Sequence, residues 1–97
     1  MKTAKGYWVI ECQDVTDPIA MQQYVELWMN IANQFEAKVI AGLNTTTVEG
    51  PRVARTLVVE FPSLALAQQC YASQEYQVAK DFALQAMQRT FSIVEGM

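Results

Sequence analysis

The segment Arg55–Phe61 reads Arg-Thr-Leu-Val-Val-Glu-Phe and is the clearest strand in the chain. Its β-branched and aromatic residues favour extended structure, and Pro62 directly after it ends the run. Leu57 and Val59 alternate with Val58, so this strand is apolar on both sides. A sheet with one face in solvent should instead alternate between apolar and polar residues. We therefore expect the second face of the sheet to be covered by something outside the single chain.

Three further strands and three helices are predicted on either side of this segment. Asp17-Pro18 combines a preferred N-cap with a preferred first helical residue, and Ser63 and Ser73 can cap two later helices. Apolar residues at three- and four-residue spacing indicate the helices, and short β-branched or aromatic runs indicate the strands. The predicted strands are 7–13, 38–43 (or on through the threonines at 45–47), 55–61 and 91–95, and the predicted helices are 18–36, 64–71 and 74–88.

This order of elements predicts an α+β fold of the ferredoxin-like kind. Strands and helices in β-α-β-β-α-β order give four antiparallel strands with the helices on one face. Residues 1–97 are expected to form a single domain, since the chain has no linker, repeat or low-complexity segment. The predicted core between helices and sheet consists of Trp8 (or Tyr7), Met21, Tyr24, Trp28, Leu57, Val59, Phe61 and Phe82.

Composition excludes several classes of function. Hydrophobic residues make up 52% of the chain, which is generous for a small domain and favours self-association. The net charge is −3, and the seven basic residues are scattered along the sequence, so nucleic-acid binding is not expected. No apolar stretch is long enough to span a membrane, and no signal peptide precedes the first strand. These features predict a cytoplasmic protein that has no membrane partner.

The chain contains no histidine, which removes histidine triads, histidine metal sites and histidine general bases. Cys12 and Cys70 are far apart and form no metal-binding motif, so both are expected to be reduced, buried, apolar residues. There is also no glycine-rich phosphate loop. We therefore predict no metal, nucleotide or other cofactor.

Several motifs spread over the chain resemble one known family. They are Lys-Gly-Tyr-Trp at 5–8, Asp-Val-Thr-Asp-Pro at 14–18, Val-Glu-Gly at 48–50, Arg-Thr-Leu-Val-Val-Glu-Phe-Pro-Ser at 55–63, Ser-Gln-Glu-Tyr-Gln at 73–77 and Ile-Val-Glu-Gly at 93–96. Together they resemble domain-of-unknown-function family 1330 of the dimeric α/β-barrel superfamily. The resemblance implies that two subunits pack sheet against sheet to form a barrel of eight strands.

The resemblance implies no settled activity, and fold-level analogy to the enzymes of the superfamily is weak support for any reaction. The sequence also departs from the family at three places. Glu36-Ala37 stands where a Gly-Gly pair is usual, Ala72 precedes the Ser-Gln-Glu-Tyr motif where the family often has His or Asn, and Ala83 stands where an arginine is common. A family reaction that used those polar groups would be lost or altered here.

Glu11, Glu60 and Tyr7 are the candidate catalytic residues. Alternation places Glu11 with Tyr7 on one side of its strand and Glu60 with Val58 on one side of the other. Both glutamates would then line the sheet face opposite the helices, with Glu60 near Tyr7. A carboxyl in an apolar cavity has a raised pKa and can act as a general acid or base. The alternative is an ion-paired or solvent-facing residue at the end of a strand.

Tyr24, Trp28, Arg55, Tyr71 and Tyr76 are the candidate ligand-binding residues. The aromatic rings could form the walls of a pocket between helices and sheet, although rings at helical spacing are more often plain core. Arg52 and Arg55 could bind an anion, or could form ion pairs at the rim.

Two classes of function remain open. The first is a homodimer that binds a small apolar or aromatic molecule without demonstrable catalysis. The second is a small cofactor-independent enzyme, monooxygenase- or isomerase-like, with a glutamate as its acid or base. The missing histidine favours the first class.

Overall fold

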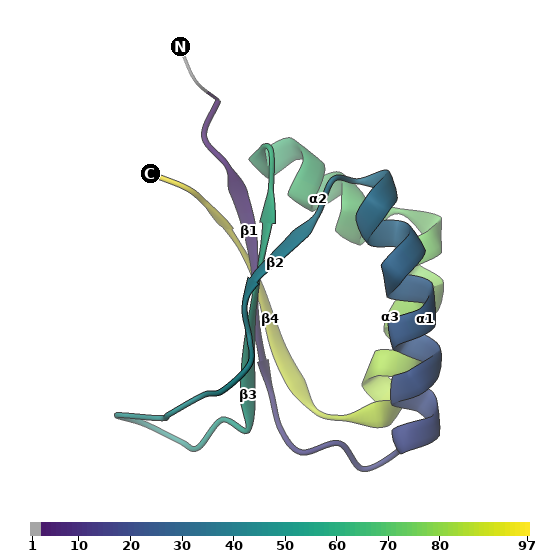
Figure 1. The fold of residues 1–97 in the computed structure, drawn as a ribbon, viewed down its shortest axis with the longest axis vertical. Coiled ribbons are helices and arrows are strands. Elements are labelled where there is room, and N and C mark those ends of the chain that lie inside the picture. The colour runs from purple at the N-terminus through teal and green to yellow at the C-terminus, as the bar shows by residue number, and fades with distance from the viewer. Residues whose placement is uncertain (1–2) are drawn as a thin grey trace.

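The computed structural model describes residues 3–97 and consists of one four-stranded antiparallel sheet with three helices on one face (Figure 1). The elements follow in this order: β1 (Gly6–Cys12), α1 (Pro18–Gln34), β2 (Lys38–Ala41), β3 (Arg55–Phe61), α2 (Leu64–Ala72), α3 (Gln74–Ala86) and β4 (Arg89–Glu95).

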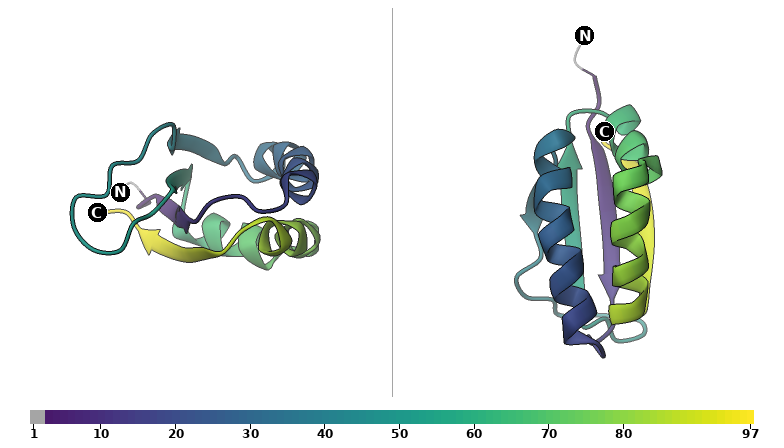
Figure 2. Two further views of the ribbon diagram at one scale, coloured as in Figure 1. Left: turned by 90° about the horizontal axis from the view of Figure 1, so that it is seen from below. Right: turned by 90° about the vertical axis from the view of Figure 1, so that its right-hand side faces the viewer.

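The strand order across the sheet is β2-β3-β1-β4, and every neighbouring pair is antiparallel. This arrangement confirms the predicted ferredoxin-like α+β fold. Helices α1 and α3 lie side by side over the sheet, with α1 on the side of β2 and β3 and α3 on the side of β4 (Figure 2). The other face of the sheet has no helix on it (Figure 1), and we call it the open face.

All three predicted helix caps are present. The Asp17 carboxylate accepts a hydrogen bond from the Ala20 amide at 3.1 Å, and Pro18 is the first residue of α1. The Ser63 and Ser73 hydroxyls accept from the amides of Leu66 and Tyr76 at the starts of α2 and α3. Each cap satisfies an amide that has no acceptor within its helix, which is why the helices begin at these residues.

The second strand is shorter than predicted. It ends at Ala41, and its pairing with β3 slips by one residue between Val39 and Ala41, as in a β-bulge. The threonines that could have extended it have another role, because the hydroxyls of Thr45 and Thr47 accept hydrogen bonds from the amides of Thr56 and Val53. Local bonding of threonine hydroxyls to the backbone thus replaces a strand ladder.

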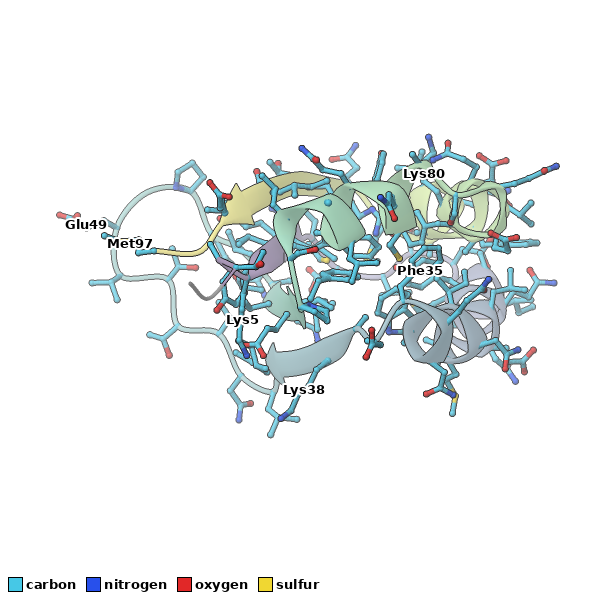
Figure 3. The ribbon with its side chains drawn as sticks, turned by 90° about the horizontal axis from the view of Figure 1, so that it is seen from above. Lys5, Phe35, Lys38, Glu49, Lys80 and Met97 are labelled. Carbon is cyan, nitrogen blue, oxygen red and sulfur yellow. The ribbon has the colours of Figure 1, made fainter. Side chains whose placement is uncertain are left out.

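The connection from β2 to β3, residues 42–54, projects to the side of the sheet away from the helices (Figures 1 and 2). We call it the 42–54 loop. Glu49 in this loop and Met97 at the C-terminus both lie on that side (Figure 3). The loop exposes two apolar side chains, since Leu43 is 94% and Val48 is 86% accessible.

The predicted core is confirmed. Trp8, Tyr24, Val59 and Phe61 are buried between helices and sheet, and Met21, Trp28, Leu57 and Phe82 pack against them half-buried. Small residues let α3 approach its neighbours closely, because Ala79, Ala83 and Ala86 are fully buried. Cys12 and Cys70 are buried free cysteines, as predicted.

The three departures from the family pattern now have structural contexts. Glu36 has φ = 56°, a left-handed conformation that glycine adopts without strain, so a glycine there in relatives matches the backbone. Ala83 is fully buried, and Ala72 is exposed at the end of α2. A long arginine side chain at position 83 would require repacking between α3 and the rest of the core.

Candidate functional site

An apolar groove lies between α1 and the sheet, on the side of β3. It consists of two hollows that share Met21, Arg55 and Leu57. The first has a volume of about 210 Å³ and is lined by apolar and aromatic residues of α1, β1, β2 and β3, including Trp8, Tyr24, Val25, Trp28 and Val39. The second has a volume of about 200 Å³ and extends towards Cys12, Val15 and Met87. We call the two together the α1–β3 groove.

The groove has a simple structural cause. Strand β2 has only four residues and a register shift, and all four are exposed, so it forms a short, loosely covered edge beside β3. Helix α1 therefore has no long strand beneath its outer side, and the rings of Tyr24 and Trp28 face the first hollow. The indole of Trp28 lies 5.3 Å from that of Trp8, measured between ring centroids. A half-buried aromatic wall of this kind suits an apolar ligand.

Three of the five predicted ligand-binding residues, Tyr24, Trp28 and Arg55, line the first hollow. Tyr76 is fully buried in the core behind it, and Tyr71 packs half-buried on α2 against Trp8 and Phe91. These two tyrosines are structural neighbours of the groove and are not part of its lining.

A hydrogen-bonded network lies behind the groove wall. The hydroxyls of Tyr24 and Tyr76 are 2.9 Å apart, and the Arg89 guanidinium donates to the Tyr76 hydroxyl at 3.1 Å. Arg89 also lies over the Phe91 ring at 5.0 Å. Burial, followed by the neighbouring Tyr24, raises the pKa of Tyr76, so its hydroxyl stays protonated. The network fixes the ring of Tyr24 in the groove wall. Sequence reasoning missed Arg89, because only the strand register brings it beside residues from α1 and α3.

Cys12 lies at the sheet end of the second hollow, between two arginines. The register places Arg55 on one neighbouring strand and Arg89 on the other, directly opposite Cys12. Two opposing effects act on the thiol. Burial raises the pKa of Cys12, Arg89 and Arg55 lower it, and the net result is a raised pKa. Burial also raises the pKa of Cys70, to about 12.

We expect neither thiol to be reactive in the folded protein. At pH 8, the native protein should react with a disulfide reagent such as dithionitrobenzoate at least ~100-fold more slowly than the protein in concentrated urea, because reaction needs an accessible thiolate. A Cys70→Ala variant would show the behaviour of Cys12 alone. Rapid native reaction of that variant would mean that the two arginines outweigh burial.

The candidate catalytic residues lie on the open face, on the opposite side of the sheet from the groove. Tyr7 is directly opposite Glu60 in the β1–β3 register and Glu11 is opposite Thr56, so the two glutamates are at opposite ends, as predicted. The Lys5 ammonium lies 2.9 Å from the Glu60 carboxylate, and the Tyr7 hydroxyl donates to the same carboxylate at 3.5 Å.

Of the two alternatives for Glu60, the structure favours the ion-paired one. The hydrogen bond from Lys5 is the largest influence and, with the nearby positive charges of Lys5 and Lys38, it lowers the pKa of Glu60 below its usual value. Glu60 therefore matches the alternative reading of an ion-paired residue at the end of a strand. A carboxylate that is ionised at neutral pH cannot serve as a general acid there.

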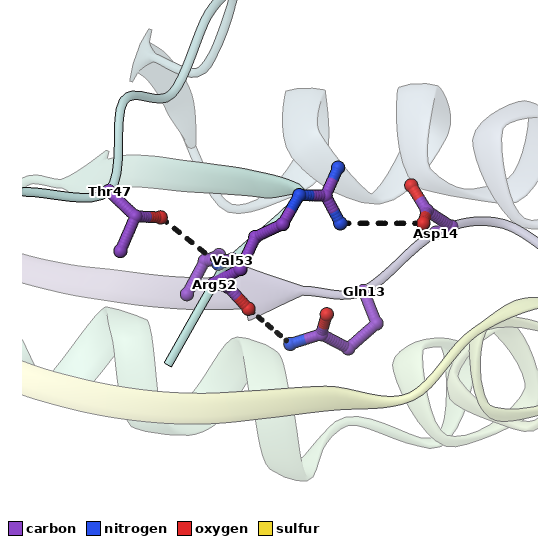
Figure 4. A network of polar contacts seen from close by, with 5 residues as sticks. All are labelled: Gln13, Asp14, Thr47, Arg52 and Val53. Carbon is purple, nitrogen blue, oxygen red and sulfur yellow. Dashed lines mark hydrogen bonds and ion pairs between the residues drawn. The ribbon is translucent and has the colours of Figure 1, made fainter. Parts of the chain in front are cut away.

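Arg52 and Arg55 have different surroundings. Arg52 lies 3.5 Å from the Asp14 carboxylate, its carbonyl oxygen accepts a hydrogen bond from Gln13, and the Thr47 hydroxyl bonds to the Val53 amide beside it (Figure 4). This network ties the base of the 42–54 loop to the end of β1. Arg55 donates through Nε to the Gly42 carbonyl at 3.0 Å and makes no ion pair within residues 3–97.

Two other features are absent from the described residues. Within residues 3–97, no helix is both long enough and apolar enough to cross a membrane. Over the same range, no three His, Cys, Asp or Glu side chains are grouped so that they could hold a metal ion.

Comparison with known proteins identifies the family. The model of the family described as "Domain of unknown function (DUF1330)" matches residues 5–97. The chain belongs to this family. The match covers nearly the whole chain and confirms the resemblance seen in the sequence motifs. No curated protein matches the chain.

Solved structures with low sequence identity share the fold of this DUF1330 protein. A protein of unknown function from Rhodopseudomonas palustris is 13% identical with a TM-score of 0.77, and the match covers 99% of this chain and 85% of that one. A dimeric protein of unknown function with a ferredoxin-like fold, from Bacteroides fragilis, is 16% identical with a TM-score of 0.62 and coverages of 94% and 95%. A protein provisionally named as an antibiotic biosynthesis monooxygenase, from Nitrosomonas europaea, is 15% identical with a TM-score of 0.54 and coverages of 100% and 93%. At these identities the likeness shows the fold alone.

Proposed function

We propose that this DUF1330 protein is a homodimer that binds a small apolar or aromatic molecule in the α1–β3 groove of each subunit. The observation that carries the proposal is the half-open groove lined by Tyr24, Trp28 and Leu57, with Trp8 at its base. Covering apolar surface in such a hollow contributes about 25 cal/mol of binding free energy for each Å² that is removed from water. The modest volume of each hollow, at or below 210 Å³, favours a molecule smaller than a typical drug.

Binding without catalysis is favoured by the position of the acidic residues. An acid or base acting on a molecule in the groove must lie within hydrogen-bond reach of it. Glu11 and Glu60 lie on the other side of the sheet, and Asp14, at the rim of the second hollow, pairs with Arg52. The groove therefore offers apolar contact and a cation, with no free carboxylate positioned for proton transfer.

The dimer is supported first by the open face of the sheet. Tyr7, Val9, Val58 and Val94 form its centre, because they share one side of β1, β3 and β4 in the strand register. Tyr7, Val9 and Val58 are half-buried in the single chain and Val94 is exposed. A second copy of the same face, related by a two-fold axis, would cover these residues. The solved relative from Bacteroides fragilis is itself described as dimeric.

The sheet face alone is too small for a stable dimer. Three strands of seven residues and one of four, ~4.8 Å apart and rising ~3.3 Å per residue, give a flat face of roughly 400 Å². An interface of standard size buries about 800 Å² of accessible surface on each partner. The 42–54 loop projects on the same side and carries the exposed Leu43 and Val48. We therefore include this loop in the proposed interface, where it would extend over the edge of the second subunit.

The groove can be tested by filling it. Val25 lines the first hollow from α1 and is 41% exposed, so tryptophan is tolerated there but occupies the space of a ligand. We expect Val25→Trp to bind cinnamamide, a neutral aromatic probe, at least ~tenfold more weakly than the parent protein, because the indole takes the apolar contact area. Binding would be measured by heteronuclear NMR titration.

Val78→Trp is the matched control for this experiment. Val78 is an exposed valine of α3 and lines neither hollow. This variant should bind cinnamamide like the parent. Equal binding by both variants, or shifts confined to residues outside the groove, would refute the proposed site.

A further inference from the structure

We infer that the ligand of the α1–β3 groove carries a carboxylate and that Arg55 binds it. This inference rests on the proposed function and adds the chemical class of the ligand, an apolar or aromatic monocarboxylic acid. The groove supplies the apolar contact, and Arg55 supplies a cation at the point where the two hollows meet.

The position of Arg55 is set by the sheet. It is the first residue of β3, opposite Cys12 in the register, and it borders both hollows of the groove together with Met21 and Leu57. It also borders a third hollow formed by residues 39–44. Arg55 is therefore available to a molecule in either hollow of the groove.

The charge of Arg55 is not neutralised by the protein. Its Nε donates to the Gly42 carbonyl, and no carboxylate within residues 3–97 lies within ion-pair distance of it. Of the five N–H donors of a guanidinium, this bond uses one. The lining of the two hollows includes a single carboxylate, Asp14, and that group pairs with Arg52. The one carboxylate of the lining is therefore already paired, and the charge of Arg55 is left for a ligand.

The bond to Gly42 also orients Arg55. Holding Nε fixes the plane of the guanidinium and leaves the two terminal nitrogens for a ligand. That geometry matches the two oxygens of a carboxylate, which arginine binds through paired hydrogen bonds. Apolar neighbours such as Leu57 exclude water on one side and strengthen these bonds.

The test compares cinnamate with cinnamamide, which have the same shape and differ in charge. We expect the parent protein to bind cinnamate about five- to tenfold more tightly than cinnamamide, a range that allows for solvent screening of an exposed arginine. Arg55→Gln should lose that preference and keep its affinity for cinnamamide. Arg55→Lys should keep part of the preference, because lysine retains the charge but not the paired donors.

Lys80→Gln is the matched control, because it removes one positive charge on α3 at a residue that lines neither hollow. It should keep the full preference for cinnamate. Equal affinity of the parent for both probes would overturn this inference and leave the proposed function standing. An unchanged preference in Arg55→Gln would overturn the role of Arg55. If neither probe binds, the proposed function fails and the inference fails with it.

Discussion

Replacing Val58 with lysine is expected to give a monomer at micromolar concentration, or a protein that precipitates. Val58 lies opposite Val9 at the centre of the open face, between the ion-paired end at Glu60 and the Thr56 end. In the proposed dimer Val58 lies near the two-fold axis. The substitution therefore places two ammonium groups, one from each subunit, close together in an apolar interface. An uncompensated buried charge costs about 3–5 kcal/mol, a large part of the free energy of a weak dimer.

The oligomeric state would be measured by light scattering on a gel-filtration column. Val78→Lys is the control, because Val78 is an exposed valine on α3 on the other side of the molecule and should leave the dimer intact. A parent protein that is monomeric at micromolar concentration would rule out the dimer itself. A Val58→Lys variant that stays dimeric and stable would instead indicate pairing through an edge strand, with β4 as the edge that has an unbroken seven-residue register.

The parts of the fold that depend on local pattern were predictable from the sequence. The alternation in Arg55–Phe61 predicted which side chains face the helices, and the register confirms that Leu57 and Val59 lie on the side of Trp8 and Ile10. Asp17-Pro18 predicted the first residue of α1, because capping is decided by a few neighbouring atoms. The β-α-β-β-α-β order predicted that the helices would lie on one face of the sheet, as they do.

The candidate site was only partly predictable, because it depends on contacts between distant segments. The groove exists because β2 stops at Ala41 after a register shift, and no periodic pattern marks that stop. The sequence does not distinguish Arg52 from Arg55. Only the folded chain brings Asp14 to Arg52, while no carboxylate of residues 3–97 pairs with Arg55. Similarly, the sequence left two alternatives open for Glu60, and only the folded chain places Lys5 beside it and lowers its pKa.

The two tryptophans offer the second large test, since one is structural and the other borders the groove. Trp8 is fully buried, lies 4.9 Å from the rings of Phe61 and Tyr76, and donates through Nε1 to the Ala67 carbonyl at 3.0 Å. We expect Trp8→Ala to lower the free energy of unfolding by about 3–5 kcal/mol, because it leaves a large cavity and removes the hydrogen bond from Nε1 to the Ala67 carbonyl. For a domain with a total stability of about 5–15 kcal/mol, that change unfolds much of the protein.

Trp28→Ala should cost less, about 1–2 kcal/mol, because the half-buried Trp28 indole already borders the first hollow and its loss enlarges an existing space. It should instead weaken cinnamamide binding, an effect that the stability measurement does not report. Urea unfolding followed by circular dichroism, at one protein concentration for all variants, would compare the two substitutions. Equal stability losses would mean that Trp28 belongs to the core as fully as Trp8, and the groove would then lose the aromatic wall on which the proposed ligand site depends.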